Sequence, residues 1–342
     1  MVSRHEEWHH HKKLTMDFRT EVKVEGSAKK ISYKTSVMFI GSCFAGEMAG
    51  KLEAGLMPVM CNPGGVVYNP LSVAATVRNI ISEKVFKSDD LWFHNNKWLS
   101  FSHYTDFSGE NSDLVLERLN SSAQSARRFL LNARFLFVTF GTARIFRRSD
   151  TGEVVSNCHK IPAQFFTREL LTVDAVVAEW TQLLDELKRF NPDLAVVFTV
   201  SPVRHWKDGA HGNQISKAVL LLAIENLLYH YTKPGYFPSY EIFMDDLRDY
   251  RFYDTDMVHP SVAAVEYVWE KFRQVWFDPG TSDTWREVAS VKMASEHRFM
   301  NSSNKERAEF AAGMIRKIEL LHSRDNGIDF STLLEYFRKL IM

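Results

Sequence analysis

Two kinds of apolar pattern alternate along the chain. Short runs of consecutive apolar residues are each followed by a longer stretch in which apolar residues recur every three to four positions. This alternation is typical of buried parallel strands connected by amphipathic helices, so it predicts an α/β fold with helices covering a sheet. The expected strands are 37–40, 57–61, 135–140, 195–200 and, as the last candidate, 240–244. The expected helices are 45–56, one that opens near Pro70, 114–131, 174–190, 212–231 and 263–276.

Three segments lie outside this alternation. Residues 1–16 are polar and include a run of three histidines, which is typical of a disordered leader. Residues 84–112 are rich in Trp, His and Phe and indicate an insertion. Residues 281–342 are rich in Lys and Glu and predict a helical C-terminal extension. We therefore expect one α/β domain over 17–280 with appendages, not two independent domains.

The first predicted strand ends in a small polar turn. Gly41 is followed by Ser42 and Cys43, and the helical pattern begins at once after them. The turn therefore places a hydroxyl and a thiol at the N-terminus of a helix, where unpaired N–H groups and the helix dipole favour negative charge. Either side chain is a candidate nucleophile.

A second chemical signal stands far downstream. Asp256 precedes His259 by three residues, and Pro260 and Ser261 then open the last predicted helix of the α/β domain. An imidazole with a nearby carboxylate is the usual combination of a general base and the group that orients it. Together with the turn at Gly41, this pair predicts a nucleophile–His–Asp hydrolase.

Small and polar residues follow the other predicted strands as well. In an open α/β sheet, ligands bind beyond the carboxyl ends of the strands, so we expect these residues to converge at one edge. The groups concerned are Ser42 and Cys43, Gly64 and Gly65, Gly141 and Thr142, and the stretch from Ser201 to Arg204 and His205.

Composition narrows the function classes. The chain has 342 residues with 42 Lys and Arg against 42 Asp and Glu, so no net charge points to nucleic acid or an anionic membrane. The three cysteines fit neither a disulfide framework nor a compact zinc motif, and no glycine-rich cofactor motif is present. No apolar run is long enough to span a bilayer, and no secretory signal is visible. We expect a cytoplasmic protein without metal or cofactor.

Several motifs, taken in order, resemble one known family. They are Gly41–Ser42–Cys43–Phe44–Ala45, Asn62–Pro63–Gly64–Gly65, Phe140–Gly141–Thr142–Ala143, Asn157–Cys158–His159, Ser201–Pro202–Val203–Arg204–His205 and Asp256–Met257–Val258–His259. The chain resembles the GSCFA family, a relative of the SGNH/GDSL hydrolases, over about 17–277. This resemblance implies a flavodoxin-like three-layer αβα core. It also implies ester hydrolysis or acyl transfer.

The resemblance assigns roles to particular residues. Asp256 and His259 match the Asp-x-x-His motif, and Gly65, with Gly64 beside it, matches the oxyanion-hole glycine. Two positions depart from the pattern. Aligned without a gap to Gly-Asp-Ser, the turn puts Cys43 in the nucleophile column. Ala143 stands where Gly-x-Asn would place the asparagine whose side chain donates to the oxyanion.

Several roles stay open at this point. Cys43 is slightly favoured as nucleophile by the gapless alignment, with its pKa expected to be lowered by the helix end and His259, and Ser42 is the alternative. Asn157 or His159 are candidates for the missing oxyanion donor. Arg204 and His205 are candidates for binding an anionic group of the substrate.

The function favoured by these residues is hydrolysis of a carboxylic ester of a small molecule or glycan through an acyl-enzyme. An O-acyltransferase on the same scaffold is the first alternative, since an acceptor hydroxyl can displace water in the second step. A non-catalytic ligand-binding protein is the other. The oligomeric state is left open.

Overall fold

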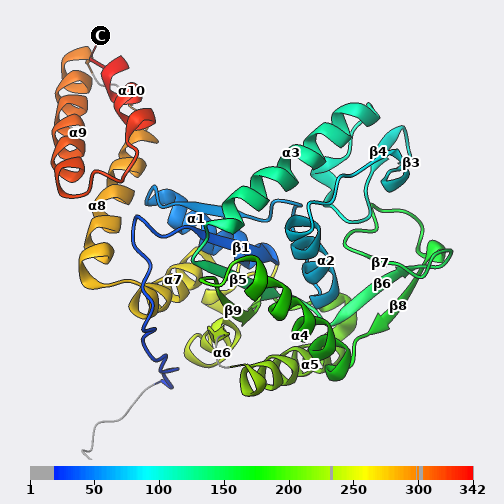
Figure 1. Cartoon of the computed structure of the whole chain (residues 1–342). Helices are drawn as coiled ribbons and strands as arrows, with labels where there is room; N and C mark the ends of the chain where they lie inside the picture. Colours follow the sequence, from blue (N-terminus) through cyan, green and yellow to red (C-terminus); the bar gives the residue numbers. More distant parts are fainter. Residues whose placement is uncertain (1–18, 232–233, 298, 300–302, 342) are drawn as a thin grey trace, which may run out of the picture.

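A five-stranded parallel sheet forms the centre of the structure, a computed structural model that describes residues 19–231, 234–297, 299 and 303–341 (Figure 1). The strands, in spatial order, are β10 (Gly235–Tyr236), β9 (Ala195–Val200), β5 (Phe135–Phe140), β1 (Val37–Gly41) and β2 (Val59–Cys61). Counted along the chain from β2, this is the 2-1-3-4-5 order of flavodoxin-like sheets. The expected fold class is confirmed. The leader predicted over 1–16 lies outside the described residues.

The three central strands are buried along their whole length. Every residue of β1, β5 and β9 is shielded from solvent, as expected for parallel strands with helices on both faces. In register, Val37 pairs with Phe135 and Gly41 with Thr139, while Phe140 pairs with Val200. The carboxyl ends of the three strands therefore lie at the same edge.

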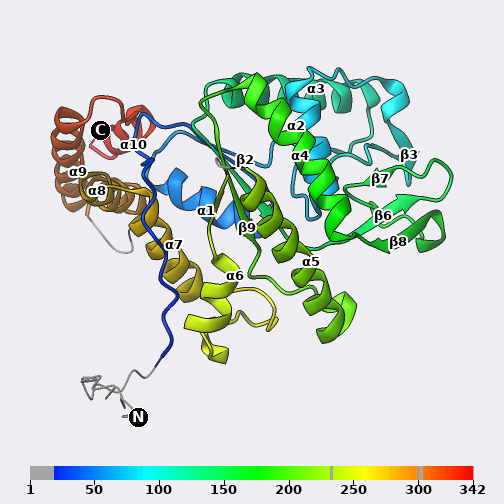
Figure 2. The same ribbon diagram turned by 60° about the horizontal axis from the view of Figure 1, so that its bottom comes forward.

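Helices cover the two faces of the sheet and divide the core in two (Figures 1 and 2). On one face, Phe39 and Phe137 stack with their ring centroids 4.9 Å apart, and Phe272 packs on both. On the other face, Trp180 packs on Phe140 and Phe198. The first face carries α1 (Cys43–Ala54) and α7 (Val262–Trp276), and the second carries α2 (Pro70–Ile81), α3 (Ser112–Leu131), α4 (Val173–Phe190) and α5 (Gly209–His230).

The last predicted strand, 240–244, is wrong. This stretch forms the short helix α6 (Ser239–Glu241) and a π-helical turn at Ile242–Asp246. Neighbouring apolar residues there belong to three different packing clusters, Tyr240 to one, Ile242 to the second and Phe243 to the third. A helical turn can direct them to three sides, whereas a strand offers only two faces. The fifth strand is instead the two-residue β10.

Two small antiparallel sheets were not expected from the sequence. The predicted insertion contains the hairpin of β3 (Trp92–His94) and β4 (Lys97–Leu99), and a three-stranded sheet of β7 (Val154–Val155), β6 (Arg144–Arg148) and β8 (Phe166–Leu170) follows β5. The two lie side by side at one end of the molecule (Figure 1), with the Arg148 guanidinium 4.9 Å from the Trp92 ring centroid.

The C-terminal region is helical, as predicted. It consists of α8 (Pro279–Ser295), α9 (Asn304–Arg324) and α10 (Ser331–Lys339), which lie together beyond α1 and α7 (Figure 2). Trp285 of α8 packs on Trp269 of α7 with ring centroids 5.1 Å apart, and its Nε1 donates to the Lys51 carbonyl of α1 over 2.8 Å. The helices thus share the apolar core of the first sheet face.

Candidate active site

The turn Gly41–Ser42–Cys43, called the nucleophile turn below, is held by contacts from two other segments. The Gly41 N–H donates to Asn62 Oδ1 over 2.8 Å, and the Ser42 N–H donates to the Thr139 carbonyl over 3.2 Å. Gly41 has a φ of +147°, and a Cβ there would lie 2.1 Å from the Thr139 carbonyl oxygen. Only glycine fits this position, which lets the chain turn sharply from β1 into α1.

The two candidate nucleophiles differ in access. Ser42 is the N-cap residue of α1, yet its side chain caps nothing; it is 1% exposed and its Oγ has no partner among the described residues. Cys43 is the first residue of α1 and is half-buried. Reagents in solution therefore meet the thiol more readily than the hydroxyl.

The expected lowering of the Cys43 pKa is wrong for the resting structure. Burial raises the pKa of this thiol, and Glu47 one helical turn further adds to the effect. The N–H groups of Phe44 and Cys43 and the charge of Lys217 act in the opposite direction but do not prevail. The thiol is protonated at rest and needs a base to become a nucleophile.

The carboxylate of Asp256 and the imidazole of His259 form a hydrogen-bonded pair. His259 Nδ1 lies 2.5 Å from Asp256 Oδ2, and Asp256 Oδ1 accepts the N–H groups of Val258 and His259, each over 2.9 Å. These hydrogen bonds lower the pKa of Asp256 to about 2, so it stays ionised. Both side chains are half exposed, at 48% and 49%. Among the described residues, the ring nitrogen Nε2 has no hydrogen-bond partner.

The pair lies at the same end of the molecule as the nucleophile turn. Both α1 and α7 begin at the carboxyl edge of the sheet and pack on the same face. Lys51, about two turns into α1, forms an ion pair with Glu266, about one turn into α7. The N-terminal parts of α1 and α7 therefore lie side by side. In the part of the chain that the structure describes, no hydrogen bond joins the His259 ring to Ser42 or Cys43.

Most of the predicted oxyanion donors already have acceptors. The Gly65 N–H donates to the Asn62 carbonyl over 2.7 Å, and the N–H groups of Gly141 and Thr142 both donate to the Tyr68 carbonyl, over 2.7 and 3.1 Å. Gly64 is buried, and its carbonyl accepts the Tyr104 N–H. These hydrogen bonds shape the edge of the sheet around the turn, but they occupy the donors of Gly65, Gly141 and Thr142.

Ala143, which stands in place of the expected asparagine, is fully buried in the second core face. Its N–H donates to Ser216 Oγ over 2.7 Å, and the same oxygen lies 3.0 Å from Thr142 Oγ1. A position packed in this way has no room for a longer amide side chain that must reach the substrate.

Asn157 and His159 support the insertion. Asn157 donates through Nδ2 to Thr105 Oγ1 over 3.2 Å and accepts the His159 N–H over 2.8 Å. His159 Nε2 lies 2.9 Å from the Ser100 carbonyl. Within the described residues, none of these hydrogen bonds reaches the nucleophile turn. The proposed role as replacement oxyanion donors therefore has no geometric support.

Arg204 and His205 lie in the loop after β9, beside the turn that carries the Asp–His pair. The Arg204 guanidinium lies 5.1 Å from the Trp206 ring centroid. Arg204, Trp206 and Met257 all line a cavity of about 380 Å³. The His205 ring lies 6.4 Å from that of Tyr68, and burial lowers the pKa of His205. Asp208 pairs with Arg144 and Arg168, so it does not neutralise Arg204.

Three residues at this edge were missed by sequence reasoning. Asn62 and Tyr68 bind the turn and its neighbours as described, and burial raises the pKa of Tyr68 to about 12. The third is Lys217 of α5, which is 1% exposed. A signal for it existed, because Lys217 falls on the helical stripe that also includes Asn213, Ser216, Leu220, Ala223, Ile224 and Leu227, all of them buried.

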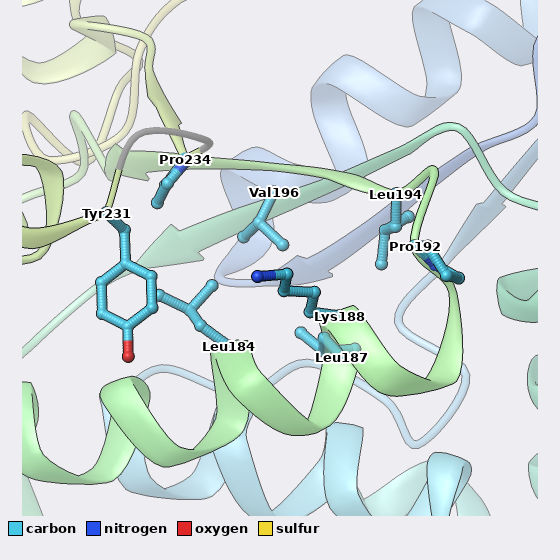
Figure 3. A pocket seen from close by; sticks show the side chains of 8 residues that line it. All are labelled: Leu184, Leu187, Lys188, Pro192, Leu194, Val196, Tyr231 and Pro234. Atoms are coloured by element: carbon cyan, nitrogen blue, oxygen red, sulfur yellow. The ribbon is translucent and has the colours of Figure 1, made fainter.

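Other features of the described residues set limits on the site. No group of three or more His, Cys, Asp or Glu there is placed to hold a metal ion, and none of the described helices is long and apolar enough to cross a membrane. A cavity of about 110 Å³ lies beside the amino end of β9, lined by Leu187, Leu194, Val196 and their neighbours (Figure 3). It is at the opposite end of that strand from the candidate site.

The fold and site define a three-layer α/β protein whose candidate nucleophile and base sit at the carboxyl edge of a flavodoxin-like sheet. The GSCFA family model matches residues 36–272, and the chain belongs to the GSCFA family. No curated protein matches the chain.

Solved structures similar to the chain include two esterases. One is a carbohydrate esterase family 3 protein from Talaromyces cellulolyticus, with 10% identity, a TM-score of 0.36, and coverage of 74% of this chain and 99% of that chain. Another is an acetyl xylan esterase from the rumen bacterium Butyrivibrio proteoclasticus, with 11% identity, a TM-score of 0.37, and coverage of 74% and 64%.

Proposed function

We propose that the chain hydrolyses a carboxylic ester through an acyl-enzyme, with Cys43 as nucleophile, His259 as general base and Asp256 as the residue that orients the imidazole. The observation that carries this proposal is the Asp256–His259 hydrogen bond of 2.5 Å at the carboxyl edge of the sheet. The carboxylate fixes the ring through Nδ1, so Nε2 is the basic nitrogen that can accept a proton.

Cys43 is preferred over Ser42 because of its position. The thiol is half-buried at the start of α1, whereas the Ser42 hydroxyl is shielded from solvent. The first two N–H groups of α1, those of Cys43 and Phe44, donate to no oxygen acceptor within the described residues, and both act on the Cys43 sulfur. They are the available donors for a negative charge that forms next to the sulfur.

The proposed reaction has two stages, acylation of Cys43 and hydrolysis of the acyl-enzyme. The Cys43 Sγ–H bond breaks, its proton passes to His259 Nε2, and a bond forms between the sulfur and the acyl carbon. The tetrahedral oxyanion is stabilised by the N–H groups at the start of α1. As the intermediate collapses, His259 returns the proton to the departing alcohol. Water, activated by the same imidazole, then releases the acid and the free thiol.

The substrate is proposed to be an O-acyl or O-acetyl ester of a small molecule or glycan. The cavity beside the Asp–His pair is lined by aromatic side chains, among them Trp206, Tyr250 and Tyr253, and by Arg204. Aromatic faces bind sugar rings or apolar groups, and an arginine binds an anionic group. This cavity is the proposed site of the alcohol part of the ester.

Acyl transfer is the second candidate. It is favoured by Ala143, because the side-chain amide of an SGNH-type oxyanion hole is absent and the position is buried. The same thioester would then be resolved by an acceptor hydroxyl that enters through the cavity at Arg204. Product analysis with and without added alcohols separates the two reactions, since transfer yields a new ester.

The test is turnover of p-nitrophenyl acetate and of acetylated sugars, with intact-mass detection of an acyl adduct. We expect Cys43→Ala to abolish the adduct and His259→Ala to reduce turnover by about 10²–10⁴-fold. Cys61→Ala is the matched control, because Cys61 is also half-buried but lies on β2. Adduct lost in Ser42→Ala but retained in Cys43→Ala would assign the attack to Ser42. No adduct with any acyl donor would favour a ligand-binding protein.

A further inference from the structure

Lys217 extends from α5 to the carboxyl ends of two central strands. Its Nζ donates to the Gly141 carbonyl over 2.8 Å and to the Ser201 carbonyl over 2.7 Å, and the residue is 1% exposed. Gly141 packs directly on the nucleophile turn, since a Cβ at Gly141 would lie 3.4 Å from the Ser42 Cβ. The amine thus lies in the layer of residues that supports Ser42 and Cys43.

The hydrogen bonds of Lys217 suit a neutral amine. Both partners of Nζ in the described part of the chain are uncharged carbonyl oxygens. A neutral amine has two N–H groups and satisfies both, whereas an ammonium has a third N–H and a charge that is costly to bury without a counter-ion. Burial lowers the pKa of Lys217 to about 7, and the Cys43 sulfur acts in the opposite direction.

The groups that face Lys217 come from several elements. They are Cys43 of α1, Arg204 and His205 of the loop after β9, and the Tyr240 ring of α6, whose centroid lies 5.5 Å from Nζ. The positive charge of Arg204 opposes protonation of Lys217, and burial raises the pKa of Tyr240, which keeps that phenol neutral. Among these groups, it is the Cys43 thiol that provides a negative charge near Lys217 when it ionises.

We propose that Lys217 is the buried counter-charge of the Cys43 thiolate and therefore a positioning residue for the nucleophile. This inference rests on the proposed function in taking Cys43 as the attacking group. When the Sγ–H bond breaks, its proton passes to His259 or to water, and the neutral Lys217 amine takes up one proton from the solvent, which completes a thiolate–ammonium pair. Because such coupling is reciprocal, removing the amine must make the thiol harder to ionise.

The test is the pH dependence of alkylation of Cys43 by iodoacetamide, followed by intact mass in a Cys61→Ala, Cys158→Ser background. Only the thiolate reacts, so the midpoint of the rate profile reports the ionisation of Cys43. We expect Lys217→Met to move this midpoint upward by about 1–3 pH units, the range for loss of one nearby opposite charge. Lys217→Arg keeps the charge and is expected to restore most of the shift.

Three controls separate the charge from its structural role. Ser216→Ala removes the acceptor of the Ala143 N–H but keeps the Lys217 amine. The midpoint of its alkylation profile should therefore equal that of the background protein. Lys271→Met removes another buried lysine, which lies in α7 and donates to Glu21. This substitution should not move the midpoint of Cys43 alkylation either. If Lys217→Met fails to fold, Lys217→Gln keeps N–H donors for the two carbonyls without the charge and is expected to give the same shift.

An unchanged midpoint in a folded Lys217→Met or Lys217→Gln variant would overturn the inference and leave Lys217 as a structural clamp. Alkylation requires no ester substrate, so this result is independent of whether the chain hydrolyses esters. Conversely, a shifted midpoint in a protein without esterase activity would keep the thiolate–ammonium pair and reject the proposed reaction.

Discussion

The two halves of the candidate site are built in opposite ways. The nucleophile turn is buried and is fixed by residues far away in the sequence, namely Asn62, Thr139 and, through Gly141, Lys217. The Asp256–His259 pair is half exposed, and the hydrogen bonds of its side chains all lie within four consecutive residues. Folding of the whole sheet creates the first half, whereas a local turn creates the second.

This difference indicates which substitutions should change activity and stability together and which should change activity alone. Substitutions in the nucleophile turn disturb buried contacts, so they should lower the free energy of unfolding and activity together. Substitutions in the Asp–His pair remove exposed groups with local contacts, so they should reduce activity and leave stability nearly unchanged. The four predictions below challenge this separation in order of expected effect.

The largest effect is expected for His259→Ala. Loss of a general base reduces the rate by about 10²–10⁴-fold, which corresponds to about 3–5 kcal/mol of transition-state stabilisation. The free energy of unfolding should change by less than about 0.5 kcal/mol, because the side chain is half exposed. Ester turnover and urea denaturation on the same preparation check both numbers. Equal losses in stability and activity would show that the two halves are not separable.

Gly41→Ala should have the next largest effect, this time on stability. The new Cβ would meet the Thr139 carbonyl oxygen, and alanine is strained at a φ of +147°. We expect a loss of about 3 kcal/mol or more in the free energy of unfolding, with loss of activity.

Gly46→Ala is the matched control for that substitution. Gly46 lies in α1, and a Cβ there meets nothing within 4 Å. Alanine should therefore stabilise the helix by about 0.5–1 kcal/mol. Both values are read from urea unfolding curves, and a Gly41→Ala protein as stable as the Gly46→Ala protein would contradict the geometry of the turn.

The same contrast explains what the sequence could predict. The strands 135–140 and 195–200 were correct because uninterrupted apolar runs need burial on both faces, and the Asp256–His259 pair was visible because its partners are three residues apart. The contacts of Lys217 were not predictable, since its partners Gly141 and Ser201 meet it only after the strands have been ordered in the sheet.

The errors have physical causes as well. The lowered pKa expected for Cys43 depends on the helix end and on His259, while burial of the thiol in the folded chain decides the direction. The Tyr240–Met244 run is as apolar as a strand, but Ser239 before it is tied to Thr199 and Val200, and the run then turns to contact three clusters. Tertiary contacts overrode local pattern in both cases.

The third prediction compares how the free energy of unfolding depends on pH through Lys217, next to the nucleophile turn, and through Asp256. The pKa of Lys217 is about 7 in the folded chain against an ordinary 10.5, so between these values the unfolded chain binds more protons and stability rises with pH. The pKa of Asp256 is lowered to about 2 from 3.8. The contribution of its carboxylate to the free energy of unfolding is therefore fully present above pH 3.8 and is lost as the pH falls through 2.

The stability difference between the wild type and Lys217→Gln should therefore grow in favour of the wild type from pH 7 to 10.5. The difference between the wild type and Asp256→Asn should change only below about pH 4. Urea denaturation across both ranges gives the curves. A Lys217→Gln difference that is flat from pH 7 to 10.5 would mean that the buried amine keeps an ordinary pKa.

The smallest effect concerns the link between the two halves, the ion pair of Lys51 in α1 with Glu266 in α7. Its side chains are 22% and 52% exposed, so we expect Glu266→Gln to cost only about 0.2–1 kcal/mol of stability. A double-mutant cycle with Lys51→Met isolates the pair. If the pair sets the height of His259 relative to Cys43, kcat should fall several-fold while KM is unchanged. If apolar packing between α1 and α7 sets it instead, kcat will be unaffected, and the two halves are aligned by the shared core alone.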